Sequence, residues 1–467
     1  MKRKKKILLI NPWIFDFTAY DFWLKPLGLL YIAGILEKFT EFELFFIDCL
    51  DRTHPLLPKK LKSKPDGRGP FFKEEIEKPE ILKEIPRRYS RYGIPVNVFQ
   101  YELEKVKTPD LILVTSGMTY WYPGVQFTIE FLRKRFKNVP IILGGIYATL
   151  MPEHARNYSG ADIIVEGLAE NKILSIIEDI IEVKLGKIYF NNLDEIPYPS
   201  YQLLREKKYL PILTSRGCPY RCTFCASYLL NKSFYQRKPE NVVEELQYYY
   251  YQFDTTHFAF YDDALFFNKE EHIKLMLKKV IELKLPIFFH TPNGLHAREI
   301  DFELASLLKE AGFKTIRLSL ESSKEELLKK VSPKITLEEF ENALENLEKA
   351  GYERNEIEVY LIVGLPGQSK EDIEESIYYV YNRGAKSRLA YFSPVPGTIE
   401  WKKMIEKGML SPDSDPLLHN KLAFSYIIKT ILPEDFEYLK NLSFKLNSEL
   451  DRRKVNSKSS KISISGA

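Results

Sequence analysis

The sequence predicts an α/β protein made of two successive domains. Short apolar segments alternate with amphipathic helical segments along most of the 467 residues, and this alternation is typical of parallel sheets with helical crossovers. The chain is also longer than the usual single domain. Near its middle, the proline-bearing segment 191–200 interrupts the alternation, because proline ends helices and disfavours strands. We therefore expect a doubly wound sheet, then a partial (β/α)6 barrel, then a small helical segment.

The predicted N-terminal domain covers residues 1–185 and is a Rossmann-like, doubly wound sheet. Helical segments at 26–38 and 125–136 separate strand candidates, and ligands of such sheets bind beyond the carboxyl ends of the strands. An insertion at about 52–100, rich in Lys, Pro, Arg and Glu, interrupts the domain; insertions this long are functional or loosely ordered. The strand candidates are short apolar runs at 6–11, 42–49, 110–115, 139–143 and 162–165.

A linker at 186–208 leads to the predicted barrel, residues 209–400. Residues 401–467 are expected to form a C-terminal helical segment, with helices at 399–410 and 433–453 and a disordered tail at 454–467 that is rich in Ser and Lys. Barrel enzymes carry their chemistry at the carboxyl ends of the strands. The barrel strand candidates are 212–215, 257–261, 287–290, 316–320, 359–363 and 389–392, with helices between them at 240–251, 270–283, 301–311 and 337–350.

Three of the four cysteines lie together after the first barrel strand. Cys218, Cys222 and Cys225 have the spacing C-x3-C-x2-C. Three thiolates this close can hold three corners of a cubane iron–sulfur cluster, which normally takes four cysteine ligands, so the fourth iron is open to a cofactor or substrate. A structural zinc site is the alternative, but it usually needs a second pair of cysteines, and Cys49 lies far upstream. A disulfide framework is disfavoured because the chain is long and poor in cysteine.

This loop resembles the cluster motif of the radical S-adenosylmethionine (SAM) superfamily, in which an aromatic residue precedes the last cysteine, as Phe224 does here. The resemblance implies a [4Fe-4S] cluster on Cys218, Cys222 and Cys225. It also implies that SAM chelates the open iron and is cleaved reductively to methionine and a 5'-deoxyadenosyl radical.

The same resemblance implies that the strand ends of the barrel contact SAM. Asp262 and Asp263 are not distinguishable from the sequence, and either can instead cap the next segment. Glu321 ends an apolar strand, where an acid is costly to bury without a partner. The implied SAM-binding residues are Phe224, Asp262, Asp263, Ser319, Glu321, Gly364 and Pro366.

The N-terminal domain resembles the cobalamin-binding domain that precedes many radical SAM domains. The match rests on the Pro-Leu-Gly helix at 26–28, a Gly-Gly loop and a Glu-Gly segment. An Asp-x-His-x-x-Gly signature, which supplies a lower histidine ligand to cobalt, has no match in the chain. Tight turns in a sheet without cobalamin are the alternative explanation of the glycines. The implied cobalamin-binding residues are Ser116, Met118, Thr119, Gly144, Gly145, Tyr147, Glu166 and Gly167.

The predicted function is therefore a radical SAM enzyme, specifically a cobalamin-dependent methyltransferase acting on an unknown substrate. The implied cofactors are the [4Fe-4S] cluster, SAM and cobalamin, and the implied partners are a small-molecule or other substrate and an electron donor such as ferredoxin or flavodoxin. No catalytic residue is assigned. One alternative is a radical SAM enzyme of another reaction class without cobalamin, such as a methylthiotransferase-like enzyme. Another is a non-catalytic corrinoid- or SAM-binding protein.

Composition favours a cytoplasmic protein. The net charge of +4 is dispersed over many acids and bases, so nothing in it requires nucleic acid. The basic run at 2–6 precedes an apolar segment too short for a signal peptide, and no uncharged stretch reaches membrane-spanning length. Arg87, Arg88, Tyr89, Arg91 and Tyr92 form a candidate site for an anion or RNA, and a solvated surface with stacked side chains is the alternative.

Overall fold

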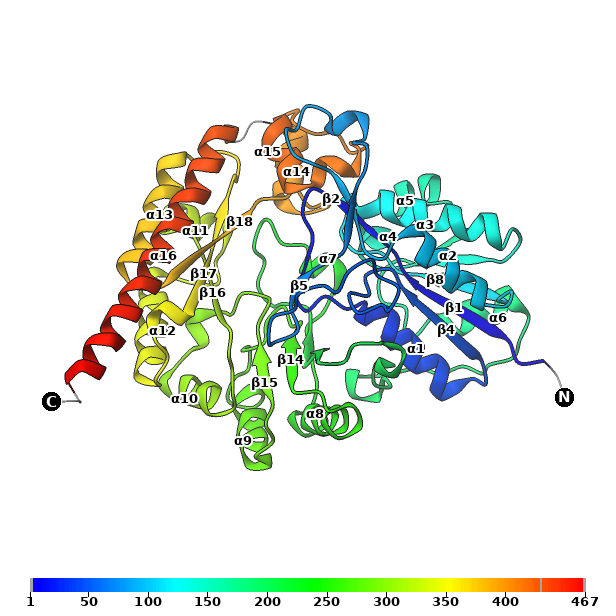
Figure 1. Ribbon diagram of the computed structural model, residues 1–467, viewed down its shortest axis with the longest axis horizontal. Helices are drawn as coiled ribbons and strands as arrows, with labels where there is room; N and C mark the ends of the chain where they lie inside the picture. The colour runs from blue at the N-terminus through cyan, green and yellow to red at the C-terminus, as the bar shows by residue number, and fades with distance from the viewer. Residues whose placement is uncertain (1–2, 429–430, 465–467) are drawn as a thin grey trace. The chain divides into compact units, whose positions relative to one another are not determined.

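In the computed structural model, which describes residues 3–428 and 431–464, the chain forms two units that interleave in sequence. Two segments of the first unit, Ala226–His257 and Asp413–Asn420, come later in the sequence than the start of the second unit. Unit 1 consists of Met1–Pro211, Ala226–His257 and Asp413–Asn420, and unit 2 consists of Ile212–Cys225, Phe258–Pro412 and Lys421–Ala467. Figure 1 shows the elements of both units.

Unit 1 is built on a five-stranded parallel sheet with the order β10-β9-β8-β1-β4. The direction in which strands are added to the sheet reverses between β1 and β8. Ligands of such sheets bind at this topological switch point. The register of β1 with β4 runs from Lys6↔Glu43 to Asn11↔Asp48, so both strands end at the same edge. All five predicted strands are present: β1 (Lys6–Asn11), β4 (Glu43–Asp48), β8 (Leu111–Val114), β9 (Ile141–Leu143) and β10 (Ile163–Ile164).

The strands of this sheet are apolar because helices cover it. Leu8, Ile10, Ile112 and Val114 are buried in one core with Ile129 of α3, as expected for parallel strands packed against helices. The helices of the N-terminal part are α1 (Leu27–Phe39), α2 (Val96–Lys105), α3 (Tyr122–Arg135), α4 (Ile146–Leu150), α5 (Pro152–Tyr158) and α6 (Ile173–Ile181). Three short turns, η2 (Thr119–Trp121), η3 (Leu193–Glu195) and η4 (Tyr201–Leu203), lie in the connections.

The insertion forms small antiparallel sheets with the segment that follows β1. β7 (Ser90–Tyr92) pairs with β2 (Ile14–Asp16) and β6 (Lys73–Glu75), and β5 (Gly69–Pro70) pairs with β3 (Tyr20–Asp21). The turn η1 (Glu80–Leu82) lies between β6 and β7.

The basic and aromatic cluster of the insertion is largely internal. Tyr89 and Tyr92 are buried, and their hydroxyls donate to the carbonyl oxygens of Phe15 and Phe17. Arg91 lies over the ring of Trp13, 5.6 Å from its centroid. These contacts give three of the five residues a structural role.

The remaining elements of unit 1 come from later in the chain. They are α7 (Ser227–Leu230), β13 (Tyr235–Gln236), α8 (Pro239–Phe253) and the turn η7 (Pro416–His419). The residues of the predicted linker pack against α1, because a Cβ on Gly34 would lie 2.2 Å from the carbonyl oxygen of Tyr198.

Unit 2 contains the strands predicted for the barrel, in two three-stranded sheets with the orders β11-β14-β15 and β16-β17-β18. Parallel bridges join Phe289 to Phe313 and Leu295 to Leu318, next to β15 and β16. The strands are β11 (Tyr209–Ile212) at the unit boundary, β14 (His257–Phe260), β15 (Phe288–His290), β16 (Ile316–Glu321), β17 (Ile357–Val363) and β18 (Lys386–Tyr391), and a short strand β12 (Ser215–Arg216) precedes the cysteines. The predicted α/β class with parallel sheets is confirmed.

The helices of unit 2 lie between its strands, and the predicted ones have bounds close to those expected. Capping boxes begin α12 at Thr336 and α13 at Ser369, each with an acid three residues on. The helices are α9 (Ile273–Leu283), α10 (Phe302–Glu310), α11 (Glu325–Val331), α12 (Leu337–Lys349), α13 (Lys370–Asn382), α14 (Ile399–Glu406), α15 (Lys421–Ile428) and α16 (Pro433–Ile464), with turns η5 (Ala297–Glu299) and η6 (Arg354–Glu356).

The long helix α16 covers the edge strand β18 (Figure 1). Ser443 Oγ lies 2.8 Å from Ser387 Oγ, and Asn447 donates to the Ser387 carbonyl oxygen at 2.9 Å. Covering an edge strand in this way removes a site of aggregation. The helix continues to Ile464, past Lys454, where the sequence predicts a disordered tail; Lys favours helix and no Gly or Pro intervenes. Residues 465–467 of that tail lie outside the described residues.

Across the described part of the chain, no helix is both long and apolar enough to span a membrane.

Candidate functional site

The three clustered cysteines lie on an irregular loop that follows β12. Cys222 is buried and Cys218 and Cys225 are half-buried, and none of the three forms a disulfide with the described residues. Burial raises the pKa of Cys218 to about 11, and the negative charges of Cys225, Asp263 and Cys222 add to this effect. The three sulfurs therefore lie within electrostatic reach of one another. Within residues 3–428 and 431–464, no group of three His, Cys, Asp or Glu side chains is arranged around a single metal ion.

This donor set fits an iron–sulfur cluster. Soft thiolates from one loop, free of disulfides, are the ligands such clusters take. Ser332 adds a polar neighbour, since its Oγ lies 3.6 Å from Cys222 Sγ. Hydrogen bonds to a ligating sulfur tune the properties of a cluster.

Asp262 holds the stem of the cysteine loop. Its carboxylate accepts hydrogen bonds from the hydroxyls of Thr214 and Ser215, both at 2.6 Å, and from the Thr214 amide at 3.1 Å. Burial raises the pKa of Asp262 to about 6, while these hydrogen bonds oppose the shift. Asp263 is exposed and its charge acts on Cys218. The structure thus separates two acids that the sequence left equivalent: Asp262 binds the stem, and Asp263 faces outward near the cysteines.

Ser319 and Glu321 end β16 with an irregular backbone. The pairing of β16 with β17 shifts register between them, and Glu321 has a φ of 70°. A left-handed conformation is strained for a residue other than glycine and is often found at functional sites. Ser319 packs tightly against the loop that follows β15, because a Cβ on Gly294 of that loop would lie 1.9 Å from Ser319 Oγ.

Lys334 is a site residue that the sequence analysis missed. Its Nζ lies 2.9 Å from Glu321 Oε1, and both side chains are buried. Burial alone would lower the pKa of Lys334, but Glu321, Cys222 and Cys225 together raise it. Glu321 was the signal in the sequence that could have pointed to Lys334, because a buried carboxylate requires a cationic partner.

Two of the three remaining predicted SAM residues, Gly364 and Pro366, lie in the turn after β17. Gly364 N donates to Gln368 Oε1 at 3.0 Å, and Gln368 Nε2 donates to the Ile362 carbonyl oxygen at 3.1 Å. Gln368 is therefore a buried brace that closes the Gly-Leu-Pro-Gly turn. Pro366 is half-buried at its tip, as Phe224 is in the cysteine loop.

In unit 1, the polar side chains predicted for cobalamin are already engaged by protein groups. Ser116 Oγ donates to the Gly144 carbonyl oxygen at 2.7 Å, and Tyr147 hydroxyl lies 2.7 Å from His154 Nδ1. Gly145 has a φ of 98°, and a Cβ there would lie 2.3 Å from the Ser116 carbonyl oxygen, so this glycine serves backbone packing.

A strap formed by residues 413–420 binds the same edge of unit 1. His419 Nδ1 lies 2.8 Å from Thr119 Oγ1, and Asn420 Nδ2 donates to Asp16 Oδ1 at 2.9 Å. Tyr122 hydroxyl donates to Asp415 at 3.3 Å. The sequence analysis did not find this strap, which is separated from Thr119 by 300 residues.

Other candidate positions in unit 1 remain open. Met118 is 45% exposed. Among the described residues, only a Val165 oxygen, at 3.8 Å, lies within 4 Å of a Cβ on Gly144, and no heavy atom lies within 4 Å of a Cβ on Gly167. Glu166 is exposed and paired with Arg156. Met118, Gly144 and Gly167 therefore lie on a part of this edge with room for a ligand, whereas the hydroxyls beside them are engaged by protein groups.

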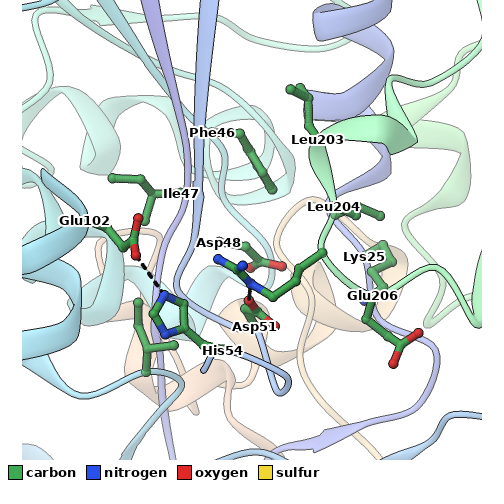
Figure 2. A pocket seen from close by; sticks show the side chains of 12 residues that line it. Lys25, Phe46, Ile47, Asp48, Asp51, His54, Glu102, Leu203, Leu204 and Glu206 are labelled. Atoms are coloured by element: carbon green, nitrogen blue, oxygen red, sulfur yellow. Dashed lines mark hydrogen bonds and ion pairs between the residues drawn. The ribbon is translucent and has the colours of Figure 1, made fainter. Parts of the chain in front are cut away.

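A small polar pocket lies at the end of β4 (Figure 2). Its volume is about 50 Å³. His54 Nε2 lies 3.0 Å from Glu102, its Nδ1 accepts from the Leu56 amide at 3.2 Å, and Arg205 donates to Asp51 at 2.9 Å. These pairs link the insertion to neighbouring parts of unit 1, and the space beside them suits a few water molecules.

Comparison with known proteins identifies the class of the second unit. Residues 212–380 match the Radical SAM superfamily. This match includes the three clustered cysteines and Lys334, so the chain contains a radical SAM domain, which defines an enzyme that uses SAM and a [4Fe-4S] cluster.

Individual relatives extend the likeness to the rest of the chain. The chain is 22% identical to cytidylyl-2-hydroxyethylphosphonate methyltransferase of Streptomyces wedmorensis, over 97% of this chain and 91% of the relative. It is 27% identical to an uncharacterized methyltransferase, PH0819, of Pyrococcus horikoshii, over 65% and 71%.

Among solved structures, the fold resembles the radical SAM methyltransferase TsrM of Kitasatospora setae with cobalamin and [4Fe-4S] cluster bound. The TM-score is 0.62 at 17% identity, covering 87% of this chain and 75% of TsrM. The cobalamin-dependent SAM radical enzyme OxsB matches with a TM-score of 0.58 at 13% identity, over 87% of this chain and 56% of OxsB. These likenesses are of fold.

Proposed function

We propose that the protein is a cobalamin-dependent radical SAM methyltransferase whose cluster is held by Cys218, Cys222 and Cys225. The observation that carries this proposal is the loop itself: three reduced cysteines within electrostatic reach of one another, in a segment that matches the Radical SAM superfamily. The methyltransferase assignment is supported by relatives of that name that cover most of the chain.

The protein's part in cluster binding is to fix the loop and balance its charge. Asp262 anchors the stem through Thr214 and Ser215, which limits the positions the cysteines can take. As cluster ligands the three thiolates, one buried and two half-buried, would carry negative charge, and the Lys334 ammonium lies where it compensates Cys222 and Cys225. When bound, the cluster supplies the electron that cleaves SAM into methionine and a 5'-deoxyadenosyl radical.

For SAM, the proposed binding groups are those that surround the cysteine loop in unit 2. Asp263 offers an exposed carboxylate next to Cys218. Glu321 and Lys334 offer a carboxylate and an ammonium held together at the end of β16. Further contacts are assigned to Ser319, Phe224, and the Gly364 and Pro366 turn.

For cobalamin, the proposed surface is the open edge of unit 1. Met118, Gly144 and Gly167 would lie against the cofactor, while Ser116, Thr119, Gly145 and Tyr147 shape the loops behind them. When bound, cobalamin supplies a methyl carrier. The architecture we propose is a cobalamin-binding-type domain over 1–185, a linker over 186–208, a six-stranded partial barrel over 209–400 and a C-terminal helical segment over 401–467.

We also propose a small-molecule substrate, a ferredoxin or flavodoxin as electron donor and a cytoplasmic location. A second candidate function is a radical SAM enzyme without cobalamin. It is favoured by one observation: Ser116, Thr119 and Tyr147 all make hydrogen bonds to protein groups at the edge where cobalamin would bind.

Anaerobic reconstitution with iron, sulfide and hydroxocobalamin, followed by desalting and an absorption spectrum, tests both candidates. A broad iron–sulfur band with retained corrinoid bands is the expected result. A cluster without corrinoid would replace the first candidate by the second. Protein that takes up no cluster under these conditions would contradict both.

A further inference from the structure

His296 lies at the carboxyl edge of the strands of unit 2, in the loop after β15. Leu295, just before it, forms a parallel bridge with Leu318 of β16, and the Leu295 amide donates to the Arg317 carbonyl oxygen at 2.7 Å. The amide of Ser319 donates back to the Leu295 carbonyl oxygen at 3.0 Å. These bonds hold His296 beside the end of β16, where Ser319 and Glu321 lie.

The imidazole of His296 packs against the cysteine loop. Its ring centroid is 4.8 Å from that of Tyr220, with the planes at 87°. Tyr220 lies between Cys218 and Cys222 in the sequence. His296 is only 5% exposed. The ring is therefore a buried neighbour of the loop that carries the cysteines.

One nitrogen of this ring lacks a partner. Within the described part of the chain, His296 Nδ1 is buried and makes no hydrogen bond. Leaving a buried polar atom unsatisfied is unfavourable, so such an atom calls for an explanation such as a ligand. Burial, with the charges of Lys334 and Arg298, lowers the pKa of His296 to about 3, which keeps the ring neutral.

His290 provides a contrast from the same segment. It is also buried, but its Nδ1 lies 3.0 Å from Thr315 Oγ1. The protein itself therefore satisfies Nδ1 of one histidine at this end of β15 and not Nδ1 of the other.

We infer that His296 Nδ1 is a hydrogen-bond partner of SAM bound at the cysteine loop. This inference rests on the proposed function, which brings SAM to that loop. SAM carries an ammonium, ribose hydroxyls and an adenine amino group, all of which donate hydrogen bonds. A neutral imidazole accepts a hydrogen bond at the ring nitrogen that carries no proton. Nδ1 therefore accepts from SAM when Nε2 carries the proton, and this contact would pair a buried nitrogen that makes no hydrogen bond to the described residues.

Two amide replacements locate the nitrogen. Asn places its polar atoms at the δ position, where Nδ1 is, whereas Gln places them at the ε position. Equilibrium dialysis of SAM against the anaerobically reconstituted full-length protein gives the Kd, and iron content is determined on the same samples. We expect His296→Gln and His296→Leu to raise the Kd about tenfold, and His296→Asn to stay within about threefold of the wild type. His290→Leu is the matched control and leaves the Kd unchanged.

The outcomes separate the inference from the proposed function. Wild-type protein that takes up iron but binds no SAM, or takes up no iron, contradicts the proposed function. If the wild type binds SAM and His296→Gln and His296→Leu bind it with the same Kd, the inference is wrong and the proposed function stands.

Discussion

The two strand-end edges of this protein differ in how completely they are satisfied by the protein itself. At the edge of unit 1, Ser116, Thr119 and Tyr147 each bond to a protein group, and the strap 413–420 adds further bonds. At the edge of unit 2, Glu321 is strained, and the buried Nδ1 atom of His296 makes no hydrogen bond to the residues that the structure describes.

This difference indicates what each edge requires. Polar groups that bond to protein groups need no ligand. Around the cysteine loop of unit 2 lie thiol groups, a buried ion pair and a buried ring nitrogen, and a charged cofactor that binds there would offset the cost of burying them. Unit 2 is thus built around a group that must be supplied. In unit 1, a ligand would rest beside hydroxyls that already make hydrogen bonds to protein groups.

The largest expected effect is the loss of the cluster. Cys222→Ser, Cys218→Ser or Cys225→Ser should each remove the iron–sulfur absorption band and all reductive SAM cleavage, because each thiolate holds a different iron. Anaerobic absorption spectra and quantification of 5'-deoxyadenosine provide the measurement. Cys49→Ala, which alters the buried cysteine of unit 1, should keep both; a band that survives in the loop variants would show that the loop is not the cluster site.

The next effect concerns the buried pair of Glu321 and Lys334. Lys334→Met should lower the free energy of unfolding by about 3–5 kcal/mol, because it leaves a buried carboxylate without a partner. The double variant Glu321→Gln/Lys334→Met should recover much of this loss. Urea denaturation of the cluster-free protein measures both. Equal destabilisation of the single and the double variant would mean that the two side chains do not interact.

Asp262 should make stability depend on pH. Its folded pKa of about 6 exceeds the ordinary value of 3.8, so between these values the folded state binds a proton that the unfolded state has released. Stability from this group therefore falls as pH rises from 4 to 7, by about 3 kcal/mol relative to Asp262→Asn. Urea denaturation of both proteins across this range checks the sign. A gap that is constant or that changes in the opposite direction would refute the assignment.

The smallest effect on stability tests the open edge of unit 1. Gly144→Ala should change the free energy of unfolding by less than about 1 kcal/mol, because the nearest atom to its Cβ is 3.8 Å away. If cobalamin rests on this glycine, the added methyl group should reduce corrinoid retained after desalting several-fold. Gly28→Ala, whose Cβ also meets open space in α1, is the matched control. Retention equal to that of the wild type would exclude Gly144 from the cofactor surface.

Sequence reasoning was most successful where the signal is local. The cysteine spacing, the apolar strands and the residues at their ends lie in short contiguous stretches, and the strands were found within a few residues of their true bounds. It could not separate Asp262 from Asp263, because adjacent residues differ only in which way the folded chain turns them. Lys334 meets Glu321 through an ion pair, and His296 meets Tyr220 through a ring contact; no local pattern encodes either contact.

The return of residues 413–420 to unit 1 has a consequence for the order of assembly. During synthesis, the residues of the five-stranded sheet leave the ribosome long before residues 413–420 are made. The hydrogen bonds of Asp16, Thr119 and Tyr122 to that segment can therefore form only late in synthesis. Contacts between distant parts of a chain slow folding and favour domain-wise intermediates. A fragment that ends at the first boundary, Pro211, would carry the sheet but lack the bonds that finish it.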